Sequence, residues 1–252
     1  MSPNRPISKN TPAKNLARSL RTARRNLREN REVSIYNSEL KKTPNMVFLW
    51  IPKSSGSTLF EQLSVHYGMQ KVLEPRRFLN LPNTGAITPG HVHWLSLLKS
   101  GLVSTDFHNN SYKFTIVRNP YDRVISLYNY LTMHKIFTGC IDVFLEEVLL
   151  RRPPIGLYNN IGLSQTNPQI DWVIDDNGEL IVDDFFRIEN LKALEDKIHD
   201  KFGTRINTDD KRNVSIRSIQ IGDILRSPHR IEVVNEIYRR DFELFEYEKM
   251  SP

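Results

Sequence analysis

The sequence predicts an α/β domain of three layers, in which a central, mainly parallel sheet is flanked by helices. Short apolar runs, which are typical of buried strands, are followed by a polar turn and then by apolar residues at helical spacing. Two such strand–turn–helix units, at residues 46–67 and 112–131, carry hydroxyl and basic side chains close to the turn. Because strands that alternate with helices are typical of parallel sheets, the pattern favours this fold class.

The totals fit one domain preceded by a tail. The chain has 252 residues, of which 39% are hydrophobic, enough for a core. Its single cysteine, Cys140, excludes an internal disulfide and favours a reducing compartment. No apolar run approaches the length of a membrane span, and the N-terminus is too polar for a signal peptide. We therefore expect a cytoplasmic protein without a membrane span.

The basic charge lies in an N-terminal arm, residues 1–45, ahead of the domain at 46–252. Residues 1–32 hold nine lysines and arginines against two glutamates, whereas the net charge of the whole chain is +6. The domain is therefore close to neutral. We expect disorder at 1–12 and a helix at 13–31. The arm is either a tail, solvated or docked on its own domain or on a second subunit, as in a homodimer, or it binds a polyanion. A solvated or docked tail is favoured, so nucleic acid is not an expected partner.

The first unit contains the loop around which the domain is organised. An apolar run at 46–50 predicts a strand, and apolar residues from 59 to 67 predict a helix. The loop between them holds one lysine, four hydroxyl side chains and one glycine: Lys53, Ser54, Ser55, Gly56, Ser57 and Thr58. This P-loop-like arrangement suits phosphate, because free N–H groups and the positive end of the helix dipole point at the anion. It is not a Walker A motif, since Lys53 precedes Gly56.

The second unit predicts another anion contact. The apolar run at 112–117 ends in Arg118, and Pro120 stands where a helix tolerates proline, at its start. Arg118 and Ser126, two helical turns further on, are placed to hold one small anion together. Arginine is the residue suited to bidentate phosphate contacts.

A histidine follows the Pro-Gly turn at 89–90. His91 stands where the next helix is expected to begin, and its intrinsic pKa suits a general base. Taken alone, one histidine beside a turn is structural more often than catalytic. His93 is the weaker candidate for the base. Neither histidine has a cysteine or carboxylate at ligand spacing, so we expect no metal.

The two anion motifs together resemble those of sulfotransferases that use 3′-phosphoadenosine-5′-phosphosulfate (PAPS). Residues 52–59 resemble their 5′-phosphosulfate loop, although Ser55 stands where many members have glycine. Arg118, with Ser126 eight residues later, resembles their 3′-phosphate motif. The likeness spans about 46–247 and is greatest to the carbohydrate-type branch, which includes heparan 2-O- and chondroitin sulfotransferases and bacterial relatives.

The resemblance implies a mechanism. PAPS is the co-substrate, no metal is needed, and the acceptor is a hydroxyl compound, in this branch a carbohydrate. His91 matches the catalytic histidine of a Gly-His pair, and Lys53 would stabilise the departing phosphate. Ser215 and Arg217 fall in a segment that closes over the nucleotide. Arg123 either adds a donor contact or pairs with a helix-end carboxylate.

The remaining predicted elements follow in chain order. They are loops at 74–85 and 151–168, helices at 141–150, 189–202 and 230–245, a turn at 176–179 between strands 172–174 and 180–182, and a strand at 185–188. The loop at 151–168 is long enough to line an acceptor pocket. Gln169-Ile-Asp-Trp172 resembles a Gln-Thr-Asp-Trp segment of bacterial relatives. Trp172 either stacks on a sugar or, as we expect, lies in the core.

Two other classes of protein fit part of these patterns. A P-loop-type kinase or NTPase shares the strand–loop–helix unit, but the lysine is misplaced, and the strand at 112–117 ends in arginine rather than in an aspartate for Mg²⁺. A non-catalytic nucleotide- or polyanion-binding protein would keep Arg118, Ser126 and the basic arm without needing His91. A lipid, a small metabolite or a peptide tyrosine as acceptor would leave the same donor motifs.

Overall fold

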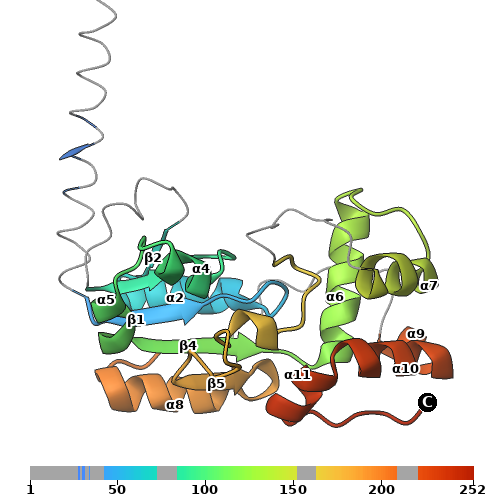
Figure 1. Ribbon diagram of the computed structural model, residues 1–252. Coiled ribbons are helices and arrows are strands. Elements are labelled where there is room, and N and C mark those ends of the chain that lie inside the picture. The colour runs from blue at the N-terminus through green and yellow to red at the C-terminus, as the bar shows by residue number, and fades with distance from the viewer. Residues whose placement is uncertain are drawn as a thin grey trace, which may run out of the picture.

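The structure, a computed structural model, describes residues 28, 30, 31, 34, 43–72, 84–151, 163–208 and 221–252 (Figure 1). Its elements are, in chain order, β1 (Met46–Leu49), α2 (Gly56–Tyr67), β2 (Gln70–Lys71), β3 (Ala86–Thr88), α4 (Trp94–Lys99), α5 (Thr105–Asn110), β4 (Tyr112–Val117), α6 (Pro120–Met133), α7 (Ile141–Val143), η1 (Phe144–Leu150), η2 (Ile170–Trp172), β5 (Asp184–Arg187), η3 (Ile188–Asn190), α8 (Leu191–Phe202), α9 (Ile221–Leu225), α10 (Pro228–Ile237) and α11 (Arg239–Leu244).

The five strands form one sheet in the order β2-β3-β1-β4-β5, and all neighbouring pairs are parallel. β1 lies at the centre, where Met46 is paired with Ala86 of β3 and Phe48 with Phe114 of β4. Because every strand runs the same way, the carboxyl ends of all five lie along one edge. The predicted fold class, an α/β domain with a parallel sheet between helices, is confirmed.

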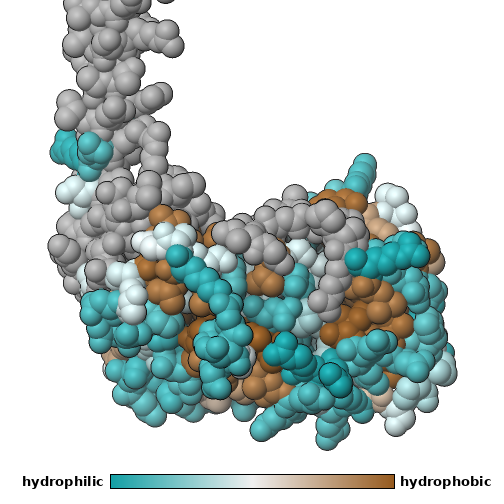
Figure 2. All heavy atoms as spheres, in the orientation of Figure 1, coloured by the Kyte–Doolittle hydropathy of each residue, from teal (hydrophilic) through white to brown (hydrophobic). Residues whose placement is uncertain are grey.

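Alternation along β1 explains the three layers. Val47, Leu49 and Ile51 belong to a core that includes residues of α4, α5 and η2, whereas Met46 and Phe48 point to the opposite core, beneath α2 and α8. Successive side chains of a strand point to opposite faces, so this apolar run supplies both cores. Hydrophilic residues cover most of the described surface on the face shown in Figure 2.

A third core lies among the helices beyond the end of β4. In Figure 1, β4 points towards α6, which stands beside α7, α9 and α10. The apolar side of α6, with Tyr121, Val124, Ile125 and Leu131, packs there against residues of η1 and α10. This helical group continues the domain past the edge at which the strands end.

Several predicted boundaries need correction. The predicted helix at 230–245 is two helices, α10 and α11, because Tyr238 interrupts it with a non-helical backbone. The predicted helix at 141–150 continues from α7 as a π-helix, η1. The predicted hairpin is reduced to a single antiparallel bridge between Ile174 and Leu180, since Trp172 belongs to the 3₁₀-helix η2.

Among the described residues, four short elements were not predicted: β2, β3, α5 and α9. Most of the N-terminal arm falls outside the described residues; Arg28, Asn30, Arg31 and Ser34 are helical and exposed, and residues 43–45 lead into β1. Within the described part of the chain, no helix is long and apolar enough to cross a membrane.

Candidate active site

The predicted site residues gather at the edge where the parallel strands end. Lys53 follows β1, His91 follows β3 and Arg118 follows β4. Since β1 lies between β3 and β4, the lysine comes between the histidine and the arginine. The carboxyl edge of an open parallel sheet is where such folds bind their ligands.

The loop after β1 holds a strained backbone. Lys53 and Ser55 both have left-handed conformations, with φ of 68° and 64°. Such a conformation costs a residue other than glycine roughly 1–2 kcal/mol. Two hydrogen bonds support the loop: Ser54 Oγ donates to Ile51 O at 2.8 Å, and Arg123 Nε donates to Pro52 O at 3.1 Å. The conformation of Ser55 is one that glycine adopts freely.

The loop leads directly into the N-terminus of α2. Ser55 is the N-cap residue, its side chain makes no capping hydrogen bond, and the first turn carries no acidic residue. The first backbone N–H groups of the helix are therefore suited to an anion. Ser57 is exposed and Thr58 is half-buried beside them, whereas Ser54 is fully buried and its hydroxyl is bonded to Ile51 O, so only its backbone serves a ligand.

Gly56 allows α2 to pack closely on β1. A Cβ atom at this position would lie 2.3 Å from Nε1 of Trp50 and 2.6 Å from its Cδ1. Contacts this short do not occur, so a side chain here would displace either the helix or the ring. Glycine at position 56 therefore follows from packing against Trp50.

Positive charges converge on the loop. Burial, together with the nearby charges of Arg118 and Arg123, lowers the pKa of Lys53 to about 8. The Lys53 ammonium lies 4.0 Å from the ring centroid of Tyr130. Cations that lie close together repel one another, and each lowers the pKa of its neighbours. An anion bound among them offsets this repulsion.

Arg118 is nearly buried at the start of the segment leading into α6, and Ser126 lies half-buried on that helix. The Arg118 guanidinium is 3.8 Å from a carboxylate oxygen of Asp122, four residues on. Ser126 follows Asp122 by another four residues, so it is one turn further along the same side of the helix. A phosphate at Arg118 and Ser126 would therefore compete with the carboxylate of Asp122.

His91 is oriented by the strand that precedes the loop. Its Nδ1 lies 2.9 Å from the carbonyl oxygen of Trp50, so Nδ1 carries the proton and donates it to the carbonyl. The lone pair is then on Nε2. The pKa of His91 is lowered to about 4 in all. Burial is the main cause, the charges of Lys71 and Lys53 add to it, and the hydrogen bond to the Trp50 carbonyl opposes it. The imidazole is thus neutral at pH 7, as a general base must be.

His93 is placed differently. It is the N-cap residue of α4, its Nδ1 lies 2.8 Å from Ser96 Oγ, and its ring packs edge-on against Trp172. Its Nε2 is buried without a hydrogen-bond partner among the described residues. The half-buried side chain therefore packs at the border of the core, in which Trp172 is buried.

Lys71 is a basic residue of this edge that the sequence did not reveal. It ends β2, and its ammonium lies 4.4 Å from the centroid of the Trp50 ring. Burial lowers its pKa, and its charge contributes to the low pKa of His91. β2 has only two residues, too few for a periodic pattern, so nothing in the sequence distinguished this lysine from a surface one.

Arg123 is fully buried, at 1% exposure. It donates from Nε to Pro52 O and from Nη2 to Gln165 O, at 3.0 Å. Of its two expected roles, the ion pair with a helix-end carboxylate is not seen among the described residues, where these backbone carbonyls accept its hydrogen bonds. Arg123 lies on α6, the helix of the second anion motif. Its hydrogen bond to Pro52 O connects this helix to the backbone of the first motif.

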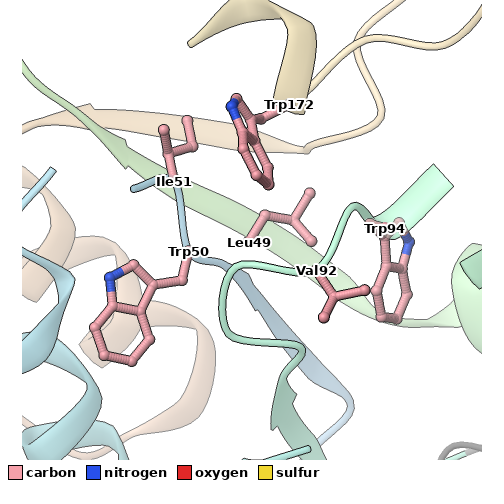
Figure 3. A pocket seen from close by; sticks show the side chains of 6 residues that line it. All are labelled: Leu49, Trp50, Ile51, Val92, Trp94 and Trp172. Atoms are coloured by element: carbon pink, nitrogen blue, oxygen red, sulfur yellow. The ribbon is translucent and has the colours of Figure 1, made fainter. Parts of the chain in front are cut away.

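A small cavity lies behind the loop. It is lined by Leu49, Trp50, Ile51, Val92, Trp94 and Trp172, and its volume is about 10 Å³ (Figure 3). Figure 3 shows the Trp50 ring on the other side of the strand from Leu49. The cavity has room for about one water molecule and none for a nucleotide.

Two predicted ligands, Ser215 and Arg217, lie outside the described residues. The same holds for most of the predicted acceptor-lining loop at 151–168. In the described ranges, no group of three or more His, Cys, Asp or Glu side chains is arranged to hold a metal ion.

The fold and the site together define a class: an α/β protein whose sheet edge presents a loop and cations for a phosphorylated ligand beside a neutral histidine. Residues 38–139 match the model of a family described as the sulfotransferase family. The matched stretch, less than half of the chain, contains Lys53, His91 and Arg118, and it supports a sulfotransferase. No curated protein matches the chain.

Proposed function

We propose that the protein is a PAPS-dependent sulfotransferase that transfers the sulfuryl group to a hydroxyl of a carbohydrate acceptor. The observation that carries the proposal is the placement of Lys53, His91 and Arg118 at three adjacent strand ends. The family match supports sulfuryl transfer, and the resemblance of the two anion motifs supports PAPS as the donor.

The residues present fit such a donor. The uncapped N-terminus of α2 and Lys53 suit the 5′-phosphosulfate, with Ser57 and Thr58 as further donors. Arg118 and Ser126 suit the 3′-phosphate, the group by which PAPS differs from ATP. The strained backbone at Lys53 and Ser55 supports this role, since strain of this kind gathers at ligand-binding loops.

In the proposed reaction the acceptor oxygen attacks sulfur, and the bond from sulfur to the bridging phosphate oxygen breaks. The acceptor proton passes to Nε2 of His91. Lys53 and the N–H groups of the loop stabilise the negative charge that develops on the leaving oxygen. Bound PAPS also brings negative charge close to His91, which raises the pKa of the imidazole from about 4 and makes it a stronger base.

Further parts of the proposal rest on the sequence. Ser215 and Arg217 close over the nucleotide, and the domain spans 46–252. Carbohydrate as the acceptor follows from the resemblance to the carbohydrate-type branch. The cytoplasmic location and the docking of the basic arm remain predictions.

Calorimetric titration with 3′-phosphoadenosine-5′-phosphate tests the proposal, with AMP as the matched ligand that lacks the 3′-phosphate. We expect tight binding of the bisphosphate, weaker binding of AMP, and loss of the preference in Arg118→Ala. Lys53→Ala should weaken both ligands, because both carry the 5′-phosphate. Equal binding of the two nucleotides, or metal-dependent turnover of ATP, would overturn the proposal in favour of a nucleotide-binding protein or a kinase.

A further inference from the structure

The peptide groups around Arg118 are held by side chains from distant parts of the chain. Gln169 Oε1 accepts a hydrogen bond from the backbone N–H of Arg118 at 2.9 Å. Gln169 Nε2 donates to the backbone carbonyl of the same residue at 2.8 Å. One fully buried amide thus satisfies both backbone groups of the residue that directly follows β4.

Gln169 is itself held by a buried carboxylate. Asp241 of α11, at 0% exposure, accepts from the backbone N–H of Gln169 at 2.8 Å and from that of Ile170 at 2.9 Å. Its Oδ2 also lies 3.4 Å from Gln169 Nε2. Burial raises the pKa of Asp241, whereas the charge of Arg123 and the two N–H donors favour the ionised form.

The backbone of the residues on either side of Arg118 is also contacted by side chains from distant parts of the chain. Glu189 accepts the backbone N–H of Asn119 at 3.2 Å and the Tyr247 hydroxyl at 2.8 Å. The Tyr247 oxygen also lies 3.3 Å from the carbonyl oxygen of Val117. The backbone of three consecutive residues is therefore contacted by side chains that follow the sulfotransferase-matched stretch in the sequence.

We propose that Gln169, held by Asp241, is a positioning residue that sets Arg118 for the 3′-phosphate of the donor. This inference rests on the proposed function. Bidentate contacts of a guanidinium depend on its position, and displacements of about 1 Å are enough to weaken them strongly. Without the amide, the N–H and carbonyl of Arg118 would lose these two hydrogen bonds in a buried place, and the backbone would shift to replace them.

The test compares two buried glutamines of one segment. Gln169→Leu removes the brace, while Gln165→Leu removes an equally buried amide whose N and O have no partner among the described residues. Affinities for 3′-phosphoadenosine-5′-phosphate and for AMP are measured by calorimetry at one ionic strength. In Gln169→Leu we expect the bisphosphate to lose about tenfold more affinity than AMP. In Gln165→Leu the ratio of the two affinities should stay that of the wild type.

Two further variants separate positioning from a general loss of structure. Asp241→Asn keeps one acceptor oxygen, so it should lower the ratio of bisphosphate affinity to AMP affinity by a smaller factor than Gln169→Leu does. If Gln169→Leu does not fold, this variant provides the test in its place. In the Arg118→Ala background, Gln169→Leu should cause no additional loss of the ratio, because the group that it positions is absent.

The outcomes distinguish the two proposals. A wild-type protein that binds both nucleotides equally refutes the proposed function. A wild type that prefers the bisphosphate, together with Gln169→Leu and Asp241→Asn variants that keep this preference, refutes the positioning role alone. A loss of the preference in Gln165→Leu as large as that in Gln169→Leu also refutes it, since the amide contact to Arg118 is then not the cause.

Discussion

The carbonyl oxygen of Trp50 lies 2.9 Å from Nδ1 of His91, so the strand that leads into the phosphate loop also fixes the histidine. Trp50 precedes Lys53 by three residues, and its ring packs against Gly56 at the start of α2. The proposed general base and the loop proposed to bind the donor are therefore positioned by one residue. A shift of Trp50 would alter the distance between them.

Replacement of His91 by alanine should lower kcat by about 10²–10⁴, the usual contribution of a general base. Affinity for 3′-phosphoadenosine-5′-phosphate should change little, because in the proposed reaction the histidine contacts the acceptor rather than the nucleotide. Turnover and calorimetry on the same preparation check both expectations. His93→Ala is the matched control: its buried ring should affect stability rather than kcat. Unchanged turnover in His91→Ala would assign the base to another residue.

The pH dependence of kcat/KM should be bell-shaped. The pKa of His91 is lowered to about 4, so activity should fall only when the pH drops towards 4 and the imidazole becomes protonated. The pKa of Lys53 is lowered to about 8, so activity should fall again above pH 8 as the ammonium loses its charge. A profile of kcat/KM reports these groups in the free enzyme. An acidic limb near the ordinary histidine value of 6.5 would contradict the assignment.

Lys71→Gln should move the acidic limb of this profile to higher pH. The positive charge of Lys71 lowers the pKa of His91, so its removal makes protonation of the imidazole easier. The alkaline limb, which Lys53 sets, should stay in place. Lys99→Gln is a suitable control, since this exposed lysine is paired with Asp176 and is not among the groups that shift the pKa of His91. Equal profiles for the wild type and Lys71→Gln would show that Lys71 does not act on His91.

Gly56→Ala should destabilise the domain by about 1–3 kcal/mol, the usual cost of overpacking. The added Cβ would meet the indole of Trp50 at 2.3 Å, so either the ring or α2 must move. Urea unfolding measures the loss, and donor affinity should fall with it. Gly222→Ala provides the control, because a Cβ at that position has no heavy atom within 4 Å. Equal stability of the wild type and Gly56→Ala would show that the contact is relaxed without cost.

The sequence predicts the fold class and the anion motifs because both depend on local patterns. The run at 112–117 is mostly apolar and forms β4 with the same boundaries, and Pro120 begins α6 as expected. By contrast, β2 has two residues and β3 has three, so neither shows a period long enough to recognise. Their order in the sheet, which places Lys71 at the edge near His91, depends on long-range pairing.

The contacts that support the site could not be predicted for the same reason. Arg123 has the spacing of a surface residue on an amphipathic helix, yet it is buried because two backbone carbonyls, of Pro52 and Gln165, accept its hydrogen bonds. No proline or glycine marks the interruption of the predicted helix at Tyr238, so nothing in the sequence indicates it. Asp241, three residues further on, faces Gln169 and Ile170 in the folded chain.

The parallel sheet has a consequence for how the protein folds. In a hairpin, strands that are neighbours in the sequence pair early, but here each strand pairs only after a crossover. Gln169 reaches Arg118 across 51 residues of chain, and Asp241, which holds Gln169, lies another 72 residues further on. Half-formed intermediates therefore lack the complete donor site, and a fragment limited to 38–139 would contain Lys53, His91 and Arg118 without β5 or the buried amide. Donor binding should accordingly report the completed fold, and the bisphosphate should raise the midpoint of thermal unfolding as its concentration increases.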